Sequence, residues 1–267
     1  KNLLKKGSLA KDWAAGYTIT LDEFGIDWSH LVRELNYPEI IGYENELDQL
    51  EHILSSPEIN NALIIGEPGV GMKNIVRAFA VKSVLGLSLP EVNYKRVVEL
   101  QMPTLLAQAQ SLDEAEKLLE TIFNEVMNAG NVILVIDEFH NYVGGEARAG
   151  ALDITGLLVP YLRFPQFPVI AITSYTGLHR EIEQHPSLLN HFVKIEVREP
   201  IPEEVQKMLQ QEIPELEAKY KVYISYQALR DLIKLSARFI TNVPFPKKAQ
   251  ELLEEIFVKT ASQHKIW

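Results

Sequence analysis

The sequence predicts an α/β protein in which a parallel, doubly wound sheet is followed by a small helical subdomain. Three observations indicate this fold. Short apolar segments alternate with helical patterns up to Glu199, as in sheets whose strands are joined by crossover helices. One apolar segment runs directly into a glycine-rich turn and then a helix, between Ala62 and Leu85. After Pro200 three helical segments follow one another with no obvious strand between them.

The first half of the sheet is predicted from two apolar segments. Residues 1–36 have no single clear period, and we expect them to form an amino-terminal extension or linker. Tyr43 to Leu54 carries apolar residues at helical spacing, and "ALII" at 62–65 is a short strand. A helix is predicted from about Met72 to Leu85, and "RVVEL" at 96–100 is a second strand.

The second half contributes three more strands. Ser111 and Glu114 form a capping box that opens a helix with an apolar stripe, and this helix ends at Gly130. "VILVIDEFH" is apolar on both faces, as a central parallel strand should be. "PVIAITS" and "VKIEV" supply two further strands. We therefore expect a five-stranded parallel sheet flanked by helices.

Composition excludes several classes of protein. The 267 residues carry a formal net charge of -10, which argues against a nucleic-acid partner. The absence of cysteine rules out disulfides and thiolate zinc sites, and we expect a cytoplasmic location. No apolar run reaches the roughly 18 residues that a membrane span needs, so we expect no membrane partner. Because the sequence starts at Lys1 and not at Met, we expect it to be part of a longer chain.

The stretch "GEPGVGMKN", Gly66 to Asn74, has the glycine frame of a phosphate-binding loop. Glycines let the backbone turn so that successive N–H groups point at a phosphate, and the following helix adds its positive dipole end. Such loops normally continue Gly-Lys-Ser/Thr, where lysine reaches the β- and γ-phosphates and the hydroxyl holds Mg²⁺. Here Gly71 is followed by Met72 and Lys73. A tight strand-to-helix turn without a ligand would show the same glycines.

Asp137 and Glu138 lie at the carboxyl end of the predicted central strand. There one carboxylate, Asp137, can hold Mg²⁺ through water while Glu138 polarises the attacking water. An acidic pair that merely opens a solvated loop is the alternative interpretation. The glycine loop one strand earlier favours the catalytic one.

Several separated motifs in the chain form a recognisable set. In order they are "IIGYENELDQLEHIL", "NNALIIGEPGVG", "AGNVILVIDEFHNYVG", "HPSLLNHF" and "FITNVPFPKKAQELLEE". Together they resemble the first ATPase module of Clp-type AAA+ protein unfoldases, over roughly Pro38 to Phe257. The resemblance implies a P-loop NTPase fold with a large α/β nucleotide-binding subdomain at 37–199 and a small helical lid at 200–267. It also implies a homo-oligomeric ring of six subunits, ATP or ADP with Mg²⁺ between subunits, protein substrates, and a Clp-type peptidase as a candidate partner.

The resemblance also assigns roles to residues of this sequence. Asp137, Glu138 and Ser174 would be catalytic, Ser174 as the polar sensor at a strand end, and Asp137 would hold Mg²⁺ through water. The nucleotide would contact the segment by the adenine, the loop and one lid residue: Ile40, Ile41, Gly42, Glu67, Pro68, Gly69, Val70, Gly71, Met72, Lys73, Asn74 and Lys248.

Three parts of the family's machinery are changed in this sequence. Aligned without a gap, Met72 takes the place of the phosphate-binding lysine and Lys73 that of the Mg²⁺-binding threonine. Adjacent helical residues are rotated by about 100°, so Lys73 cannot simply stand in for its neighbour. One inserted residue at Met72 would restore Gly-Lys-Asn, although an amide would still replace the hydroxyl. The paired arginines that reach the neighbouring subunit's γ-phosphate align with Asn190 and His191.

The third change is in the pore loop, whose aromatic and basic residues align with Ser111 and Gln110. A preserved fold with these changes suggests a module that binds ATP or ADP, hydrolyses it weakly or not at all, and supports ring assembly. Two alternatives stay open: an active unfoldase with a shifted loop lysine, and a nucleotide-free binding adaptor. Whether the module is an enzyme depends on which of these holds.

Overall fold

The computed structural model describes residues 18–35, 41–144 and 152–264. Six strands form one sheet in the order β1-β3-β4-β5-β2-β6. They are β1 (Gly25–Asp27), β2 (Ala62–Ile65), β3 (Arg96–Leu100), β4 (Val132–Ile136), β5 (Val169–Thr173) and β6 (Val193–Glu196). All neighbouring strands are parallel except β1, which runs antiparallel to β3. The predicted α/β fold is confirmed, with six strands in place of the expected five.

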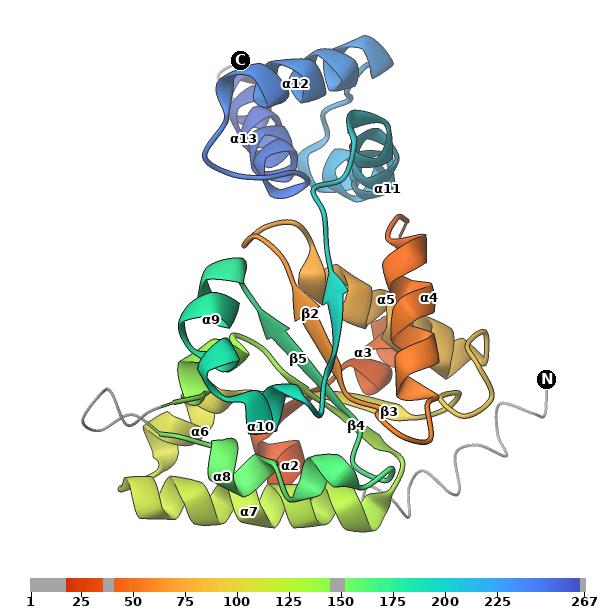
Figure 1. Ribbon diagram of the computed structural model, residues 1–267. Coiled ribbons are helices and arrows are strands. Elements are labelled where there is room, and N and C mark those ends of the chain that lie inside the picture. The colour runs from red at the N-terminus through yellow and green to blue at the C-terminus, as the bar shows by residue number, and fades with distance from the viewer. Residues whose placement is uncertain (1–17, 36–40, 145–151, 265–267) are drawn as a thin grey trace, which may run out of the picture.

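Helices cover both faces of the sheet (Figure 1). On one face lie α3 (Trp28–Leu35), α4 (Glu44–Leu54) and α5 (Met72–Leu85). On the other lie α2 (Ile19–Phe24), α6 (Met102–Gln108), α7 (Leu112–Ala129) and α8 (Thr155–Leu158). The strands β2 to β5 are buried on both faces, as the apolar sequences of β2, β4 and most of β5 predict, and β3 also buries Arg96 and Glu99.

Short elements connect β4, β5 and β6. These are the 3-10 turns η1 (Phe139–Tyr142), η3 (Tyr161–Arg163) and η4 (Ile182–Gln184), with α9 (Tyr175–Arg180) and α10 (Pro186–Leu189). The expected serine cap of α7 is confirmed, since the Ser111 hydroxyl accepts from the Glu114 amide at 3.2 Å, but the return bond of a capping box to the Ser111 amide is replaced by one to its neighbour. The carboxylate of Glu114 in turn accepts from the Gln110 amide at 2.7 Å. Ser111 therefore has a structural role.

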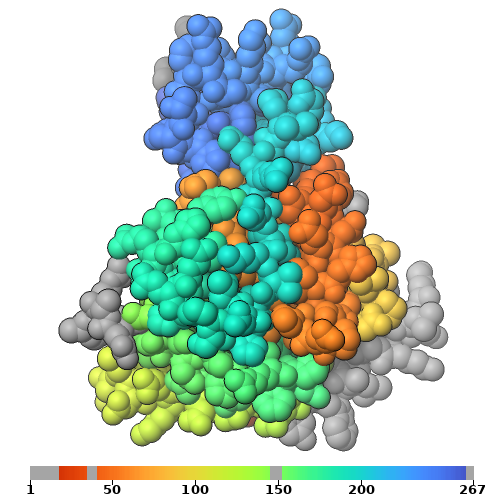
Figure 2. Space-filling model, viewed as in Figure 1, coloured from red at the N-terminus to blue at the C-terminus, as the bar shows by residue number. Residues whose placement is uncertain are grey.

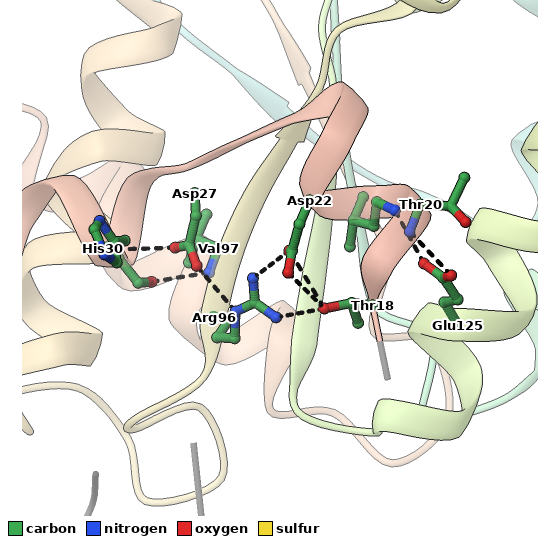
Figure 3. Close-up of polar contacts among 10 residues, drawn as sticks. Thr18, Thr20, Asp22, Asp27, His30, Arg96, Val97 and Glu125 are labelled. Atoms are coloured by element: carbon green, nitrogen blue, oxygen red, sulfur yellow. Dashed lines mark hydrogen bonds and ion pairs between the residues drawn. The ribbon is translucent and has the colours of Figure 1, made fainter. Parts of the chain in front are cut away.

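The additional strand comes from the range in which an extension was expected. Arg96 of β3, whose side chain is only 5% exposed, donates to Thr18 Oγ1 at 2.8 Å, to Asp22 at 2.7 Å and to Asp27 at 2.9 Å (Figure 3). From α7, Glu125 accepts from the Thr20 amide at 3.1 Å and from the following amide at 2.9 Å, which satisfies the start of α2 (Figure 3). These contacts fix α2, β1 and α3 to the sheet.

Three helices form the carboxyl-terminal lobe: α11 (Pro202–Tyr220), α12 (Tyr226–Phe239) and α13 (Lys247–His264). They enclose their own apolar core, which includes Val205, Leu209, Leu232, Leu253 and Phe257. Figure 2 shows this lobe as a narrower unit on top of the broader α/β part. The predicted helical lid is thus present, and its α13 begins beside the glycine loop.

Candidate functional site

The glycine loop connects β2 to α5 in a conformation that needs glycine. Gly69 and Gly71 have φ values of +106° and +95°, which other residues rarely adopt. A side chain at Gly71 would overlap the hydroxyl of Tyr43. That hydroxyl donates to the Val70 carbonyl at 2.7 Å, and burial raises the pKa of Tyr43, so it remains a donor. The loop is therefore held from below by a buried phenol.

The backbone of this loop presents free donors. Val70 and Asn74 donate back to Glu67 and Gly71, at 3.1 and 2.8 Å. Within the described part of the chain, the amides of Gly69, Gly71, Met72 and Lys73 have no backbone acceptor. Unpaired N–H groups at the start of a 14-residue helix form a favourable site for an anion.

A cavity of about 420 Å³ opens above these donors. It lies beyond the carboxyl ends of β2, β4 and β5, where parallel α/β sheets bind their ligands, and the lid closes its far side. Its lining contains nine of the residues expected from the sequence: Pro68, Gly69, Gly71, Met72, Lys73, Asn74, Asp137, Glu138 and Ser174. His140, Ile172, Thr173, Pro246, Lys247 and Gln250 complete it.

Four other expected residues near the loop lie outside this lining. Val70 is buried and Glu67 is exposed. Ile41 donates its amide to Gln211 of α11 at 3.2 Å, and Gly42 lies against Met208 of the same helix. Ile40 is outside the described residues.

Lys248 is also placed away from the cavity. Its ammonium is 3.0 Å from Glu199, its side chain is buried, and it stacks over the Phe245 ring at 4.1 Å. The preceding residue, Lys247, lines the cavity instead, and its aliphatic stem lies against Gly69. The expectation for Lys248 is therefore wrong, and we assign Lys247 to the proposed nucleotide site instead. Because the two lysines are adjacent, their helical phase decides which one faces the loop.

Lys73 is bound by two carboxylates. Its Nζ is 2.8 Å from Asp137 Oδ2 and 2.9 Å from Glu99 Oε1. Burial alone would lower the pKa of Lys73, but the hydrogen bonds to Asp137 and Glu99 outweigh it, so the pKa is raised and the ammonium stays charged. Sequence reasoning missed Glu99, although a carboxylate inside the apolar strand "RVVEL" was a signal.

The two expected catalytic neighbours of Asp137 are also in place. Glu138 is exposed, adopts a left-handed conformation with φ of +48°, and accepts from the Asn141 amide group at 3.0 Å. The Ser174 hydroxyl accepts from the Gly177 amide at 3.0 Å and so caps α9, which leaves its own proton to donate into the cavity. His140 contacts Thr173 at 3.1 Å, and burial lowers the pKa of His140 despite the nearby carboxylates.

A magnesium ion does not fit this set of residues. The Oδ2 atom of Asp137 is bound to the Lys73 ammonium, and residue 73 offers no hydroxyl. Among the residues that the structure describes, no three His, Asp or Glu side chains gather in a way that could hold a metal. The expected Mg²⁺ is thus at odds with the local chemistry.

We compared the sequence with known protein families. A profile described as "ATPase family associated with various cellular activities (AAA)" matches residues 62–192, and one described as "AAA lid domain" matches residues 202–266. The chain belongs to the AAA+ ATPase family. Over 235 residues, 88% of this chain, it is 34% identical to "Chaperone protein ClpB" of Aquifex aeolicus, and it covers 23% of that protein. Over 239 residues, 89% of the chain, it is 33% identical to "Negative regulator of genetic competence ClpC/MecB" of Bacillus subtilis, covering 29% of it.

The chain is a Clp-type AAA+ module, and it spans about a quarter of the length of these two relatives. Among solved structures, the AAA+ module superposes on the Saccharomyces cerevisiae Hsp104–casein complex in its extended conformation with a TM-score of 0.83 at 24% identity. That match covers 92% of this chain and 42% of the other. The S. cerevisiae Hsp104–ADP complex gives 0.81 over 91% of this chain and 34% of the other. In the described part of the module, no helix has the length and apolarity to cross a membrane.

Proposed function

We propose that this AAA+ module binds ATP or ADP through the backbone of its glycine loop and hydrolyses ATP weakly or not at all. One observation carries the proposal: α5 begins at Met72, so the first side chain of the helix is uncharged while the loop amides remain free. Losing a lysine there removes one charge-assisted contact, worth about 1.5–3 kcal/mol. Backbone donors, the helix dipole and Lys247 remain to hold the phosphates.

Slow hydrolysis follows from two further positions. Lys73 is held at the strand end by Asp137 and Glu99, and it therefore does not occupy the position of the loop lysine that Met72 replaces. At the expected subunit interface, Asn190 is neutral, and burial with the nearby Arg163 lowers the pKa of His191, which keeps it neutral as well. An arginine finger in related enzymes contributes about 10³ to 10⁵ in rate. Neither replacement supplies that charge.

The same proposal covers assembly and partners. We expect a homo-oligomeric ring of six subunits in the cytoplasm, with protein substrates and a Clp-type peptidase as a candidate partner. Similarity to ClpB and ClpC supports this set, and a net charge of -10 disfavours nucleic acid. Residues 37–199, joined by α2, β1 and α3, would act as the nucleotide-binding subdomain, and residues 200–267 as the lid. Mechanical work would be driven by another module of the full chain.

A calorimetric titration with ATP and ADP, combined with phosphate-release kinetics, tests the proposal. We expect saturable binding of both nucleotides and negligible release in a sample whose ring assembly is checked by sedimentation. Turnover at an ordinary AAA+ rate that Lys73→Ala abolishes would establish the active unfoldase instead. No binding at millimolar nucleotide would establish the nucleotide-free adaptor.

A further inference from the structure

Lys73 lies where a nucleotide-bound cation would be needed. Residue 73 is the second residue of α5, directly after the free loop amides, and Asp137 follows β4 across the cavity. Between them the Lys73 ammonium spans 2.8 Å to Asp137 and 2.9 Å to Glu99. A positive charge thus already lies between the phosphate loop and the acidic strand end.

Glu99 is built to keep that ammonium in place. Its side chain is only 6% exposed, and its second oxygen accepts from the Trp28 indole N–H at 3.0 Å. Gln101 donates to the oxygen that Lys73 also contacts, at 3.2 Å. If Lys73 moved away, a buried carboxylate would lose its only cation among the described residues, which is strongly unfavourable. The Lys73–Glu99 pair is therefore a fixed part of the site.

A divalent ion entering this position would meet two obstacles. It would approach a positive ammonium at hydrogen-bond distance from the same carboxylate, and like charges at such separation repel strongly in a partly buried site. It would also find no hydroxyl at residue 73 to complete its coordination.

We propose that the Lys73 ammonium replaces Mg²⁺ as the cation of this site, so that the module binds nucleotide independently of divalent metal. Two hydrogens of the ammonium are used by Asp137 and Glu99. The third is left to donate to a phosphate oxygen, and the side chain is 44% exposed to solvent and cavity. This inference rests on the proposed nucleotide binding and assigns the role of one residue in it.

The experiment is a calorimetric titration of the protein with ADP, performed once in excess EDTA and once in excess Mg²⁺ at constant ionic strength. For the unchanged protein the two Kd values should agree within about threefold. The test variant is Lys73→Thr combined with Glu99→Gln, which supplies a hydroxyl and leaves no buried carboxylate unpaired. Its Kd should become at least about tenfold tighter in Mg²⁺ than in EDTA. Circular dichroism confirms that the variant is folded.

Lys247→Ala is the matched control, because it removes the other cavity lysine, whose ion pair is with Glu251 and not with Asp137 or Glu99. It should weaken ADP equally in both conditions. Binding of the unchanged protein that improves tenfold or more in Mg²⁺ would overturn the role of Lys73 and leave nucleotide binding intact. A double variant as insensitive to Mg²⁺ as the unchanged protein would also overturn that role. Absence of binding in both conditions would overturn the proposed function itself.

Discussion

The substitution Met72→Lys should restore a phosphate contact that this module lacks. Met72 is the first residue of α5, is partly buried and lines the cavity, with its sulfur near Gly66. Lysine is similarly unbranched and can follow the same path toward the loop. The neighbouring carboxylates of Asp137 and Glu99 are already bound to Lys73, so the new ammonium remains available to a ligand.

The expected gain follows from the environment of residue 72. A charge-assisted contact contributes about 1.5–3 kcal/mol, and the partly open cavity favours the lower value. About 1.5 kcal/mol corresponds to roughly tenfold in Kd. Nucleotide affinity is measured by calorimetry in EDTA at fixed salt, because screening weakens exposed charges.

Met72→Leu serves as the control, since it keeps the volume without adding charge, and its Kd should stay within about twofold of the unchanged protein. If Met72→Lys leaves the affinity unchanged or weakens it while the protein stays folded, residue 72 does not face the phosphates. The loop would then have the inserted-residue register, with Lys73 at the position of the loop lysine.

Three further predictions concern the loop, the amino-terminal segment and the lid. Gly71→Ala should weaken nucleotide binding at least about tenfold, because it forces a side chain at φ +95° into the Tyr43 hydroxyl; unchanged affinity would show that the loop is not the binding element. Arg96→Met should lower the free energy of unfolding by about 3 kcal/mol in urea titrations, since it leaves carboxylates without their buried guanidinium; an unchanged midpoint would contradict the network of Figure 3. Burial acts to raise the pKa of Glu199, but the hydrogen bonds from the Phe245 amide and Lys248 outweigh it, so the pKa is lowered on folding. The resulting stabilisation is therefore present above the unfolded pKa and is lost as the pH falls through the folded pKa. Glu199→Gln should therefore destabilise the protein near pH 7, and the difference between the two proteins in thermal melts should shrink as the pH falls through the lowered folded pKa of Glu199. A difference that stays constant over the acidic range would refute the assignment.

The parts of the site that depend on local sequence were predictable. Glycines with positive φ, a capping serine and an acidic pair after an apolar strand each reflect constraints within a few residues. The loop, Asp137 and Glu138 were found in this way, whereas Ser174 came from the resemblance to the family; residues of the loop and all three side chains line one cavity. Their convergence follows from the parallel sheet, which brings strand ends to one edge.

The parts that depend on tertiary pairing were not predictable. β1 has three residues, too few to show an alternating pattern, and it pairs with β3, whose Arg96 also binds Asp27. The role of Glu99 as a partner of Lys73 is visible only in the fold, where α5 brings the lysine beside it. The exchange of Lys248 for Lys247 depends on the rotation of α13 against the loop, which sequence spacing alone does not determine.

Phosphate release by the protein, measured beside its Glu138→Gln variant in samples whose oligomeric state is checked by sedimentation, tests the central claim most directly. Glu138 is the residue that we expect to polarise the attacking water, and its exposed carboxylate should tolerate the change without loss of folding. We predict that both proteins bind ATP with similar affinity and release phosphate at the same background rate. A faster release by the unchanged protein that Glu138→Gln removes would show that the module is a working ATPase and would contradict the account.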